Sequence, residues 1–254
     1  MLMIELLILS LVQGVTEFLP ISSSSHLILI SNYFDFTNQN LSIDVSLHIG
    51  SFFAVLFYFR KDIFNFVKNK VLFIKILISS IPVMVFGFLL VEFELIDKLR
   101  NLKVISWSTL VFGLLLFISD RFKTINKIDK NFTIKSAMII GFFQVLSLIP
   151  GVSRSGITIT AARLLNYKRY DSAKISFLLS IPTLAAITFF GFKSVIEENS
   201  LNFSVLNFFS IVLSFLFSFI TIKYFLAYIK RFSLKVFVIY RIVLGLILLS
   251  FLYL

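Results

Sequence analysis

The chain has no cysteine, four prolines and nine glycines among its 254 residues, and only 15% of the residues are charged. The lack of cysteine excludes a disulfide framework, a thiolate metal site and a cysteine nucleophile, and it leaves the redox compartment undetermined. The low charge excludes a water-soluble globule, because 58% of the residues are hydrophobic and the mean hydropathy is +0.98. The 33 phenylalanines exclude a disordered chain. The sequence therefore predicts an all-α polytopic membrane protein.

Six apolar runs are each close to the ~20 residues that a helix needs to cross a hydrocarbon core. They cover residues 44–59, 71–91, 104–119, 174–192, 204–225 and 236–254. Two further regions, 1–31 and 134–166, are apolar at both ends and broken in the middle at Pro20 and Pro150. Irregular backbone at membrane depth persists only inside protein or beside a wet cavity. Each region is therefore predicted to be a re-entrant helix hairpin, and the first is not expected to be a cleaved signal peptide because it carries Glu5 and no basic n-region.

The two halves of the chain carry matching sequence at a nearly constant spacing. Pro20 precedes Pro150 by 130 residues, and Gly113 precedes Gly245 by 132 in a similar apolar run. This spacing indicates an inverted-topology repeat, each half a re-entrant hairpin plus three transmembrane helices. Because three is odd, the second half is expected to be inserted upside down. The expected boundaries are 1–254 for a single membrane domain, 1–120 for the first inverted repeat and 134–254 for the second.

Basic residues are concentrated in alternate connections. Eighteen of the 24 Lys and Arg lie in segments 60–75, 121–135, 163–174 and 223–235, whereas the connections 92–103 and 193–203 hold four. Lys and Arg accumulate on the cytoplasmic side of a membrane, so both termini are expected outside, with the first hairpin entering from outside and the second from the cytoplasm. The net charge of +11 is then a signal of topology and of contact with anionic membrane lipids, and no nucleic-acid partner is expected.

Two arginines remain at membrane depth, where an ionisable side chain costs ~2.5–3.5 kcal/mol. Arg241 stands alone in an apolar helix and is interpreted as a packing arginine, paired with a carboxylate or with backbone carbonyls. Arg154 lies between Ser153 and Ser155 at the second break, where a helix N-terminus would offer free N–H groups and a positive dipole end. These groups predict an anion-binding site at Arg154.

The first break supplies complementary groups. Gln13 and Glu17 share a helix face, four consecutive serines occupy 22–25, and His26 follows them. If the two breaks meet, the carboxylate, a serine, the imidazole and the Arg154 guanidinium form one pocket suited to phosphoryl transfer. In a purely structural interpretation the serines cap the broken helix and His26 neutralises Glu17. The two matched clusters together favour the functional interpretation.

Both breaks resemble the signatures of a known family. Gln13-Gly-Val-Thr-Glu-Phe-Leu-Pro-Ile-Ser-Ser-Ser-Ser-His26 and Pro150-Gly-Val-Ser-Arg-Ser-Gly-Ile-Thr-Ile159 are similar to the undecaprenyl-diphosphate phosphatases associated with bacitracin resistance. The resemblance extends to residues 48–55, 176–182 and 240–241. It implies an integral phosphatase of the bacterial inner (plasma) membrane that hydrolyses undecaprenyl diphosphate to undecaprenyl phosphate and inorganic phosphate, which recycles the lipid carrier for cell-wall synthesis. It also implies an active site open to the outer face and a need for a divalent cation.

The resemblance also implies roles for individual residues. The catalytic set is Glu17, Ser23, His26 and Arg154. The substrate-binding set is Gln13, Ser22, Ser24, Ser153, Ser155, Gly156 and Thr158. Glu17 with help from Gln13 would position Mg²⁺ or Ca²⁺. Two positions depart from the family pattern. Gln13 stands where many members have glutamate, which shifts metal or proton handling to Glu17. Ser25 stands where glycine is usual, at an expected turn that could require positive φ.

Alternatives remain open at this level. Either Ser23 attacks phosphorus while His26 takes its proton or later activates water, or His26 is the nucleophile and Ser23 orients the phosphate. An inverted-repeat secondary transporter shares the expected architecture, but its acidic residues would be distributed along the spanning helices and not gathered at two breaks. A polyprenyl-phosphate flippase activity on the same scaffold is a third possibility. A polyprenyl diphosphate lipid and membrane lipids are the expected partners, and the sequence does not determine the oligomeric state.

Overall fold

Among the residues that the structure describes, six helices are long and apolar enough to cross a membrane, as the hydropathy pattern predicts. They are α3 (Leu41–Tyr58), α5 (Lys70–Glu92), α7 (Leu102–Asp120), α11 (Arg169–Glu197), α12 (Val205–Ile229) and α13 (Lys235–Tyr253). The computed structural model describes residues 2–34, 36, 41–66, 70–197 and 205–253, and within these ranges it contains helices and one isolated bridge between Asn126 and Tyr167. The prediction of an all-α polytopic membrane protein is confirmed.

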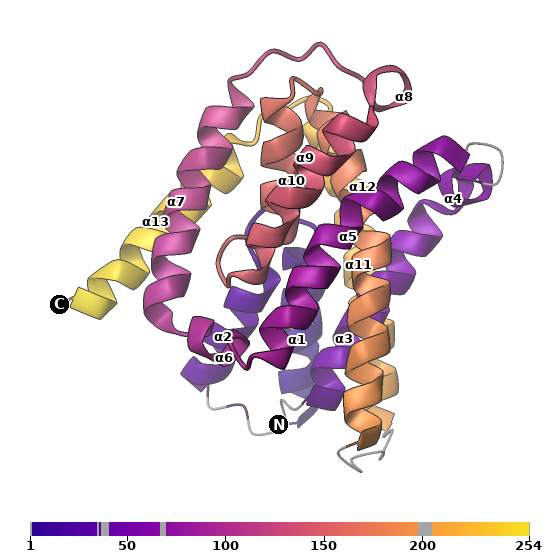
Figure 1. The fold of residues 1–254 in the computed structure, drawn as a ribbon. Helices are drawn as coiled ribbons and strands as arrows, with labels where there is room; N and C mark the ends of the chain where they lie inside the picture. Colours follow the sequence, from indigo (N-terminus) through magenta and orange to yellow (C-terminus); the bar gives the residue numbers. More distant parts are fainter. Residues whose placement is uncertain (1, 35, 37–40, 67–69, 198–204, 254) are drawn as a thin grey trace.

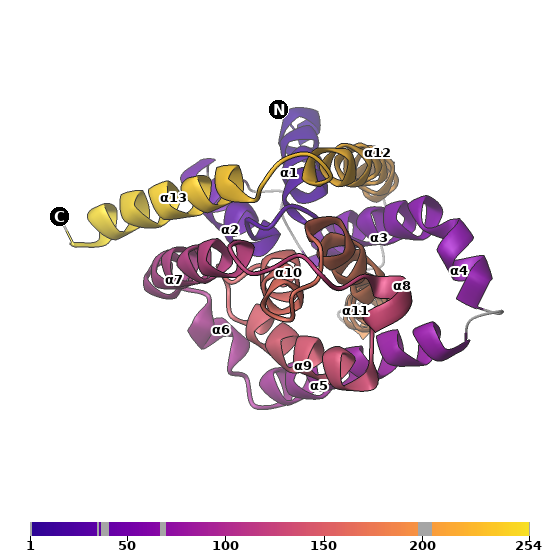
Figure 2. The same ribbon diagram turned by 90° about the horizontal axis from the view of Figure 1, so that it is seen from above.

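Both broken regions form helix-break-helix hairpins. The first consists of α1 (Leu2–Thr16) and α2 (Ser23–Phe34), and the second of α9 (Ile134–Val145), a 3₁₀ turn (Leu146–Leu148) and α10 (Arg154–Leu164). They approach the middle of the bundle from opposite ends (Figure 1). From above, α10 lies inside a ring of other helices (Figure 2). The hairpins are therefore interior elements, as the need to shield irregular backbone requires.

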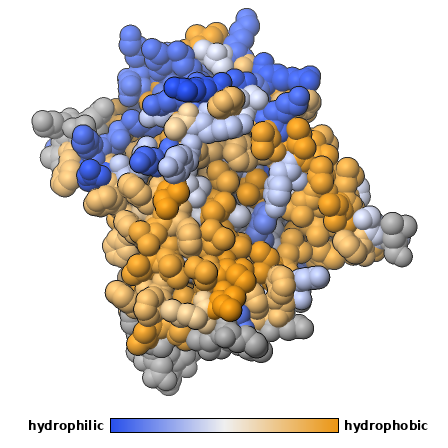
Figure 3. Space-filling view, turned by 180° about the vertical axis from the view of Figure 1, so that it is seen from behind, coloured by the Kyte–Doolittle hydropathy of each residue, from blue (hydrophilic) through white to orange (hydrophobic). Residues whose placement is uncertain are grey.

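The connections between spans separate the molecule into two ends. The short helices α4 (Arg60–Phe66) and α8 (Ile128–Asn131) lie at the end from which α9 and α10 descend, and α6 (Ile96–Leu99) lies at the other end with the N-terminus (Figure 1). A broad hydrophilic surface covers the first end, and hydrophobic side chains dominate the surface below it (Figure 3). The connection at 198–204 lies outside the described residues. The inverted repeat, its boundaries at 1–120 and 134–254, and the side on which each end lies remain predictions.

Each hairpin turns at a serine with left-handed backbone. Ser22 has φ of 77° and Ser153 has φ of 69°, and the next helix begins at the following residue in both cases. A non-glycine residue in this region costs about 1–2 kcal/mol, and such residues cluster at functional sites. The expectation that position 25 lies in the turn is wrong: Ser25 lies inside α2, because the chain completes its turn at Ser22.

Small residues bring the spans close together. A Cβ on Gly50 of α3 would lie 2.4 Å from the carbonyl oxygen of Ile211 in α12, and Ser51 makes hydroxyl hydrogen bonds to Ser214 and Ser218 at 3.2 and 3.0 Å. Helices in lipid gain little from hydrophobic association, so close backbone contact and interhelical hydrogen bonds provide the packing energy. This packing holds the framework that surrounds the two hairpins.

Arg241 joins the two breaks. Its side chain is fully buried, and it donates from Nη1 to the carbonyls of Pro20 (3.2 Å) and Val152 (2.9 Å), and from Nη2 to that of Gly151 (2.8 Å). Nε donates to the carbonyl of Thr109 at 3.3 Å. These carbonyls lie at chain breaks or in α7, and the guanidinium supplies the donors that the breaks lack. The interpretation of Arg241 as a packing arginine bound to backbone carbonyls is confirmed.

Candidate active site

Glu17 lies at the point where the two hairpins meet. Its Oε1 is 2.8 Å from Nη2 of Arg154, and its Oε2 accepts from the Ser23 hydroxyl at 2.6 Å and from the Gln13 amide nitrogen at 3.2 Å. The carboxylate is 8% exposed, so these charge-assisted contacts replace most of its hydration. The structure therefore brings Gln13, Glu17, Ser23 and Arg154 together. The structural interpretation in which His26 neutralises Glu17 is wrong, because Arg154 does so.

Local structure holds Glu17 in this position. The backbone N–H of Glu17 donates to the carbonyl of Gln13 at 3.0 Å, so the carboxylate stays one helical turn beyond the amide. The next side chain, Phe18, is fully buried and makes an edge contact with Phe177 of α11, with ring centroids 5.2 Å apart. The Ser155 hydroxyl donates to the carbonyl of Leu19 at 2.7 Å, which ties the first hairpin to the second.

His26 lies on α2 and is bonded to other partners than the carboxylate. The ring Nδ1 is 2.6 Å from the carbonyl oxygen of Ser22, which can only accept, so Nδ1 carries a proton. Nε2 of the neutral ring then accepts from the Tyr240 hydroxyl at 2.5 Å. Among the described residues, no hydrogen bond joins His26 to Ser23 or Glu17. The orientation leaves the Nε2 lone pair directed toward α13.

The other predicted substrate contacts lie around the two turns. Ser22 is 3.4 and 3.2 Å from the hydroxyls of Ser24, which is exposed, and Ser25. The Ser153 hydroxyl accepts from the backbone N–H of Gly156 at 3.1 Å and caps α10.

Residues in the first turns of α10 are occupied by protein contacts. The Thr158 hydroxyl donates to the Ser176 hydroxyl at 2.7 Å, and a Cβ on Gly156 would lie 2.9 Å from Nη1 of Arg241. Ser155, Gly156 and Thr158 are buried and support the second break. Their substrate contacts, like those of the serines at the turns, stay predictions.

Sequence reasoning missed three partners of the site. His48 of α3 accepts at Nδ1 from the Gln13 amide at 3.0 Å, Tyr240 donates to His26, and the Ser176 carbonyl accepts from Nη1 of Arg154 at 3.3 Å. The signal for His48 was a polar side chain within an apolar run. The signal for Tyr240 was its position next to Arg241, an arginine at membrane depth on the same helix turn. No local pattern indicates the partner of either side chain.

A metal ion would find few protein ligands here. Within the described ranges, no three His, Asp or Glu side chains gather as a metal-binding cluster. The Oε1 atom of Gln13 is buried and has no hydrogen-bond partner among the described residues. The amide nitrogen of the same side chain donates to Glu17. Mg²⁺ binds through one or two carboxylates and keeps water or substrate phosphate as its other ligands. The two oxygen-bearing side chains fit this mode of binding.

The bundle and the site define a class of protein: a polytopic helical membrane protein with a buried carboxylate and a half-buried arginine, hydroxyl and imidazole at two broken helices. Comparison with known sequences narrows this class. A family model described as bacitracin resistance protein BacA matches residues 6–247. The chain belongs to this family, and the resemblance seen in the two break sequences is confirmed.

Curated relatives match over nearly the whole chain. The undecaprenyl-diphosphatase of Pelagibacter ubique (strain HTCC1062) is 50% identical over 252 residues, which cover 98% of each chain. That of Saccharophagus degradans is 41% identical and covers 93% of each chain, and that of Jannaschia sp. is 38% identical and covers 98% of each. The whole bundle, and not only the two breaks, is therefore similar to these proteins.

Proposed function

We propose that this protein hydrolyses undecaprenyl diphosphate to undecaprenyl phosphate and inorganic phosphate in the bacterial inner (plasma) membrane, and so recycles the lipid carrier for cell-wall synthesis. The observation that carries the proposal is the junction at which Glu17 contacts both Arg154 and Ser23, 2.8 and 2.6 Å away, inside a membrane bundle. The curated relatives bear the name of this activity. Bacitracin resistance, the property for which the family is named, accords with it.

Arg154 is the group that binds the terminal phosphate. Nη2 is committed to Glu17 and Nη1 contacts the Ser176 carbonyl at 3.3 Å, so Nε and the remaining N–H bonds are available to an anion. The side chain is 13% exposed, which permits access by substrate. Arg154 is also the first residue of α10, where free N–H groups and the positive end of the helix dipole favour a phosphate.

Ser23 is the proposed nucleophile. Its oxygen attacks the terminal phosphorus, its proton passes to Glu17, and the bond from phosphorus to the bridging oxygen breaks to release undecaprenyl phosphate. Water then displaces the serine and yields inorganic phosphate. The hydroxyl donates to the carboxylate at 2.6 Å, which supports Glu17 in preference to His26 as the acceptor of the proton. The serine leaves with the proton held by Glu17, and Nε2 of His26, which accepts from the Tyr240 hydroxyl, would take the proton of the water once that hydroxyl turns away.

A divalent cation, Mg²⁺ or Ca²⁺, would be held by Glu17 and by the unpartnered Oε1 of Gln13. When bound, it would neutralise the charge that develops on the phosphates. The amide nitrogen of Gln13 donates to both Glu17 and His48, so Oε1 lies on the other side of the amide and would join Glu17 on the cation only after the amide turns over. The chain's own contribution in the present arrangement is to orient the carboxylate.

The active site is proposed to open to the outer face, with both termini outside. The basic connections that contain α4 and α8 lie at the end opposite α1 and α2 (Figure 1), and basic connections accumulate in the cytoplasm. The hairpin that contributes Glu17 and Ser23 would then enter from the outside. The secondary transporter and the flippase, with no covalent chemistry, are the competing functions.

The test is phosphate release by the purified protein in detergent from a polyprenyl diphosphate labelled in its terminal phosphate. We expect release by the parent and by Ser250→Ala, a control on exposed α13 surface, and loss of release in Ser23→Ala. Label trapped on the protein that survives acid is phosphoserine, whereas label lost in acid and stable in base is phosphohistidine and would assign the attack to His26. Absence of release by the parent would overturn the phosphatase proposal in favour of transport.

A further inference from the structure

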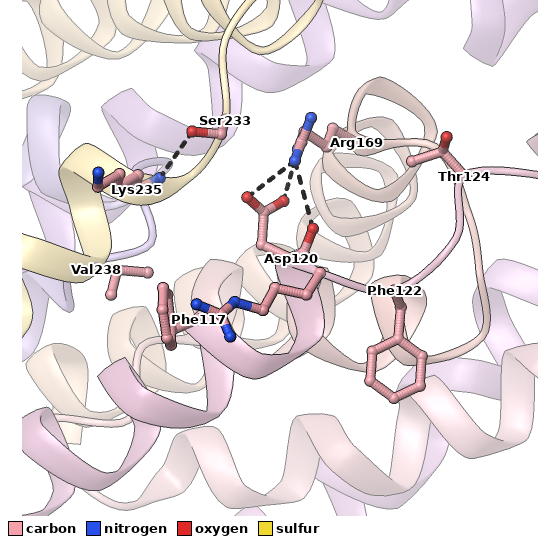
Figure 4. Close-up of a pocket in the computed structure, with 9 residues that line it drawn as sticks. Phe117, Asp120, Phe122, Thr124, Arg169, Ser233, Lys235 and Val238 are labelled. Carbon is pink, nitrogen blue, oxygen red and sulfur yellow. Dashed lines mark hydrogen bonds and ion pairs between the residues drawn. The ribbon is translucent and has the colours of Figure 1, made fainter.

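A cavity of about 500 Å³ lies among the ends of three spans, away from Glu17. It is found where α7 ends at Asp120, where α11 begins at Arg169 and where α13 begins at Lys235 (Figure 4). Helices that end together on one face place their termini at the membrane–water interface. The cavity is therefore at interfacial depth, on the basic end of the bundle.

The walls of the cavity differ in polarity. The apolar lining consists of Phe117, in the last turn of α7, which is half-buried, and Val238, in the first turn of α13, which is buried in the core. Arg121, Arg169 and Lys235 contribute three cationic side chains at the ends of the helices. A cavity at interfacial depth with both apolar and cationic lining matches a phosphate headgroup and the start of its acyl chains.

The single carboxylate of the cavity is already neutralised. Arg169 donates to Asp120 from Nε at 2.6 Å and from Nη2 at 3.1 Å, and the backbone N–H of Leu234 donates to it at 3.2 Å. Nε of the fully buried Arg163 lies 3.7 Å from the same group. Asp120 therefore positions the cavity wall and leaves an excess of positive charge for a ligand.

Arg121 and Lys235 keep unused donors. The Arg121 guanidinium lies over the Phe117 ring, 4.1 Å from its centroid, which holds the group in place without occupying its N–H bonds. Among the described residues, no acceptor lies within hydrogen-bond distance of the side-chain nitrogens of Arg121 or Lys235. The Arg121 guanidinium, held by the ring and with free N–H bonds, is suited to phosphate oxygens, and the exposed Lys235 ammonium adds a second cation.

The segment that carries Arg121 is rigidly held. Arg163 is fully buried and donates to the carbonyls of Asp120 at 3.2 Å, Phe122 at 2.5 Å and Lys123 at 3.3 Å. The backbone on both sides of Arg121 is thus fixed by one interior guanidinium. This part of the cavity backbone is organised before any ligand arrives, which lowers the entropy cost of binding.

We propose that this cavity binds a phosphate anion through Arg121, Arg169 and Lys235, at a site separate from Glu17 and independent of the proposed hydrolysis. The headgroup phosphate of an anionic lipid would use both walls, and free inorganic phosphate would use the basic wall alone. The residues of the cavity are absent from the candidate active site. Loss of the anion should therefore leave the chemistry at Glu17 intact.

The test uses the full chain in nanodiscs of phosphatidylcholine with or without phosphatidylglycerol. The double variant Arg121→Gln/Lys235→Gln removes two cavity charges, and the matched control Lys127→Gln/Lys130→Gln removes two exposed charges at the same end but outside the cavity. Native mass spectrometry measures the phosphatidylglycerol that stays bound. Loss of the charge-assisted contacts in the cavity should lower the affinity of the double variant for phosphatidylglycerol by at least about tenfold beyond that of the control, because both variants lose the same general attraction of two surface charges.

A second arm separates the two sources of phosphate. Inorganic phosphate is added to protein in neutral detergent, and the melting temperature is followed for the parent, the double variant and the control. A phosphate-dependent rise that the double variant alone lacks assigns the site to free phosphate, whereas selective loss of phosphatidylglycerol alone assigns it to lipid. If the double variant and the control behave alike in both arms, the cavity binds no phosphate and the proposal is overturned. Hydrolytic activity that falls in the double variant would overturn the claimed independence of the two sites.

Discussion

Replacement of Arg241 by lysine tests whether one buried side chain aligns the two breaks. The guanidinium donates to four backbone carbonyls, those of Pro20, Thr109, Gly151 and Val152. An ammonium keeps the charge but presents three N–H bonds from one atom, so it cannot reach carbonyls spread around a planar fork. At least two of the four carbonyls should be left without a donor in a buried site.

The magnitude follows from these lost bonds. A hydrogen bond from a charged donor contributes about 1.5–3 kcal/mol, so the loss of two lowers the free energy of unfolding by about 3 kcal/mol or more. For a chain of this size each kcal/mol corresponds to about 2–4 °C, which predicts a fall in melting temperature of about 6–12 °C. Displacement of the breaks by about 1 Å would also lower activity by about 100-fold.

Arg163→Lys is the matched control. Arg163 is also fully buried and also donates to four carbonyls, but these lie at the basic end of the bundle, in the segments 120–123 and 167. We expect a similar fall in melting temperature in both variants, measured at one scan rate in one detergent. Phosphate release assayed well below both melting temperatures should be lost only in Arg241→Lys. Equal activity in the two variants would refute the claim that Arg241 aligns the site.

Three further predictions concern the site and the topology. Arg154→Lys should lower phosphate release by roughly 10²–10³-fold while the melting temperature stays within a few degrees of the parent, because the fork that grips phosphate is lost; retained turnover would limit Arg154 to neutralising Glu17. Glu17→Gln should abolish most activity and its dependence on Mg²⁺, whereas Gln13→Glu should steepen that dependence, since two carboxylates one turn apart repel until a cation binds. Titrations of activity against Mg²⁺ compare the two variants. An unchanged dependence in Glu17→Gln would remove Glu17 from the metal site. In this cysteine-free chain, Leu95→Cys should react with an impermeant maleimide from outside the cell and Lys127→Cys only after lysis; labelling of both from one face would contradict the inverted repeat.

The sequence by itself determined the number of spans, the positions of the two breaks and the family. Hydropathy over about 20 residues is a local property, and it decides whether a helix is apolar and long enough to cross a bilayer. The six apolar runs therefore correspond to six candidate spanning helices among the described residues. Pro20 and Pro150 marked breaks because polar and small residues follow each of them, whereas Pro82 and Pro182 stand in apolar runs and lie inside α5 and α11. The meeting of Glu17 with Arg154 followed from the assumption that both breaks are interior.

Only the tertiary structure decided which side chains are partners. Arg154 lies 137 residues from Glu17 and Tyr240 lies 214 residues from His26, and periodicity says nothing about contacts at such separations. Helix docking decided that Ser23 donates to Glu17 while His26 turns toward α13, and that Arg241 serves both breaks. The basic cavity also arises only when three helix ends converge, because Arg121, Arg169 and Lys235 appear in the sequence as ordinary topogenic charges. A hydrogen bond demands placement within about 0.5 Å, and the packing of whole helices, not the order of residues along one of them, sets that placement.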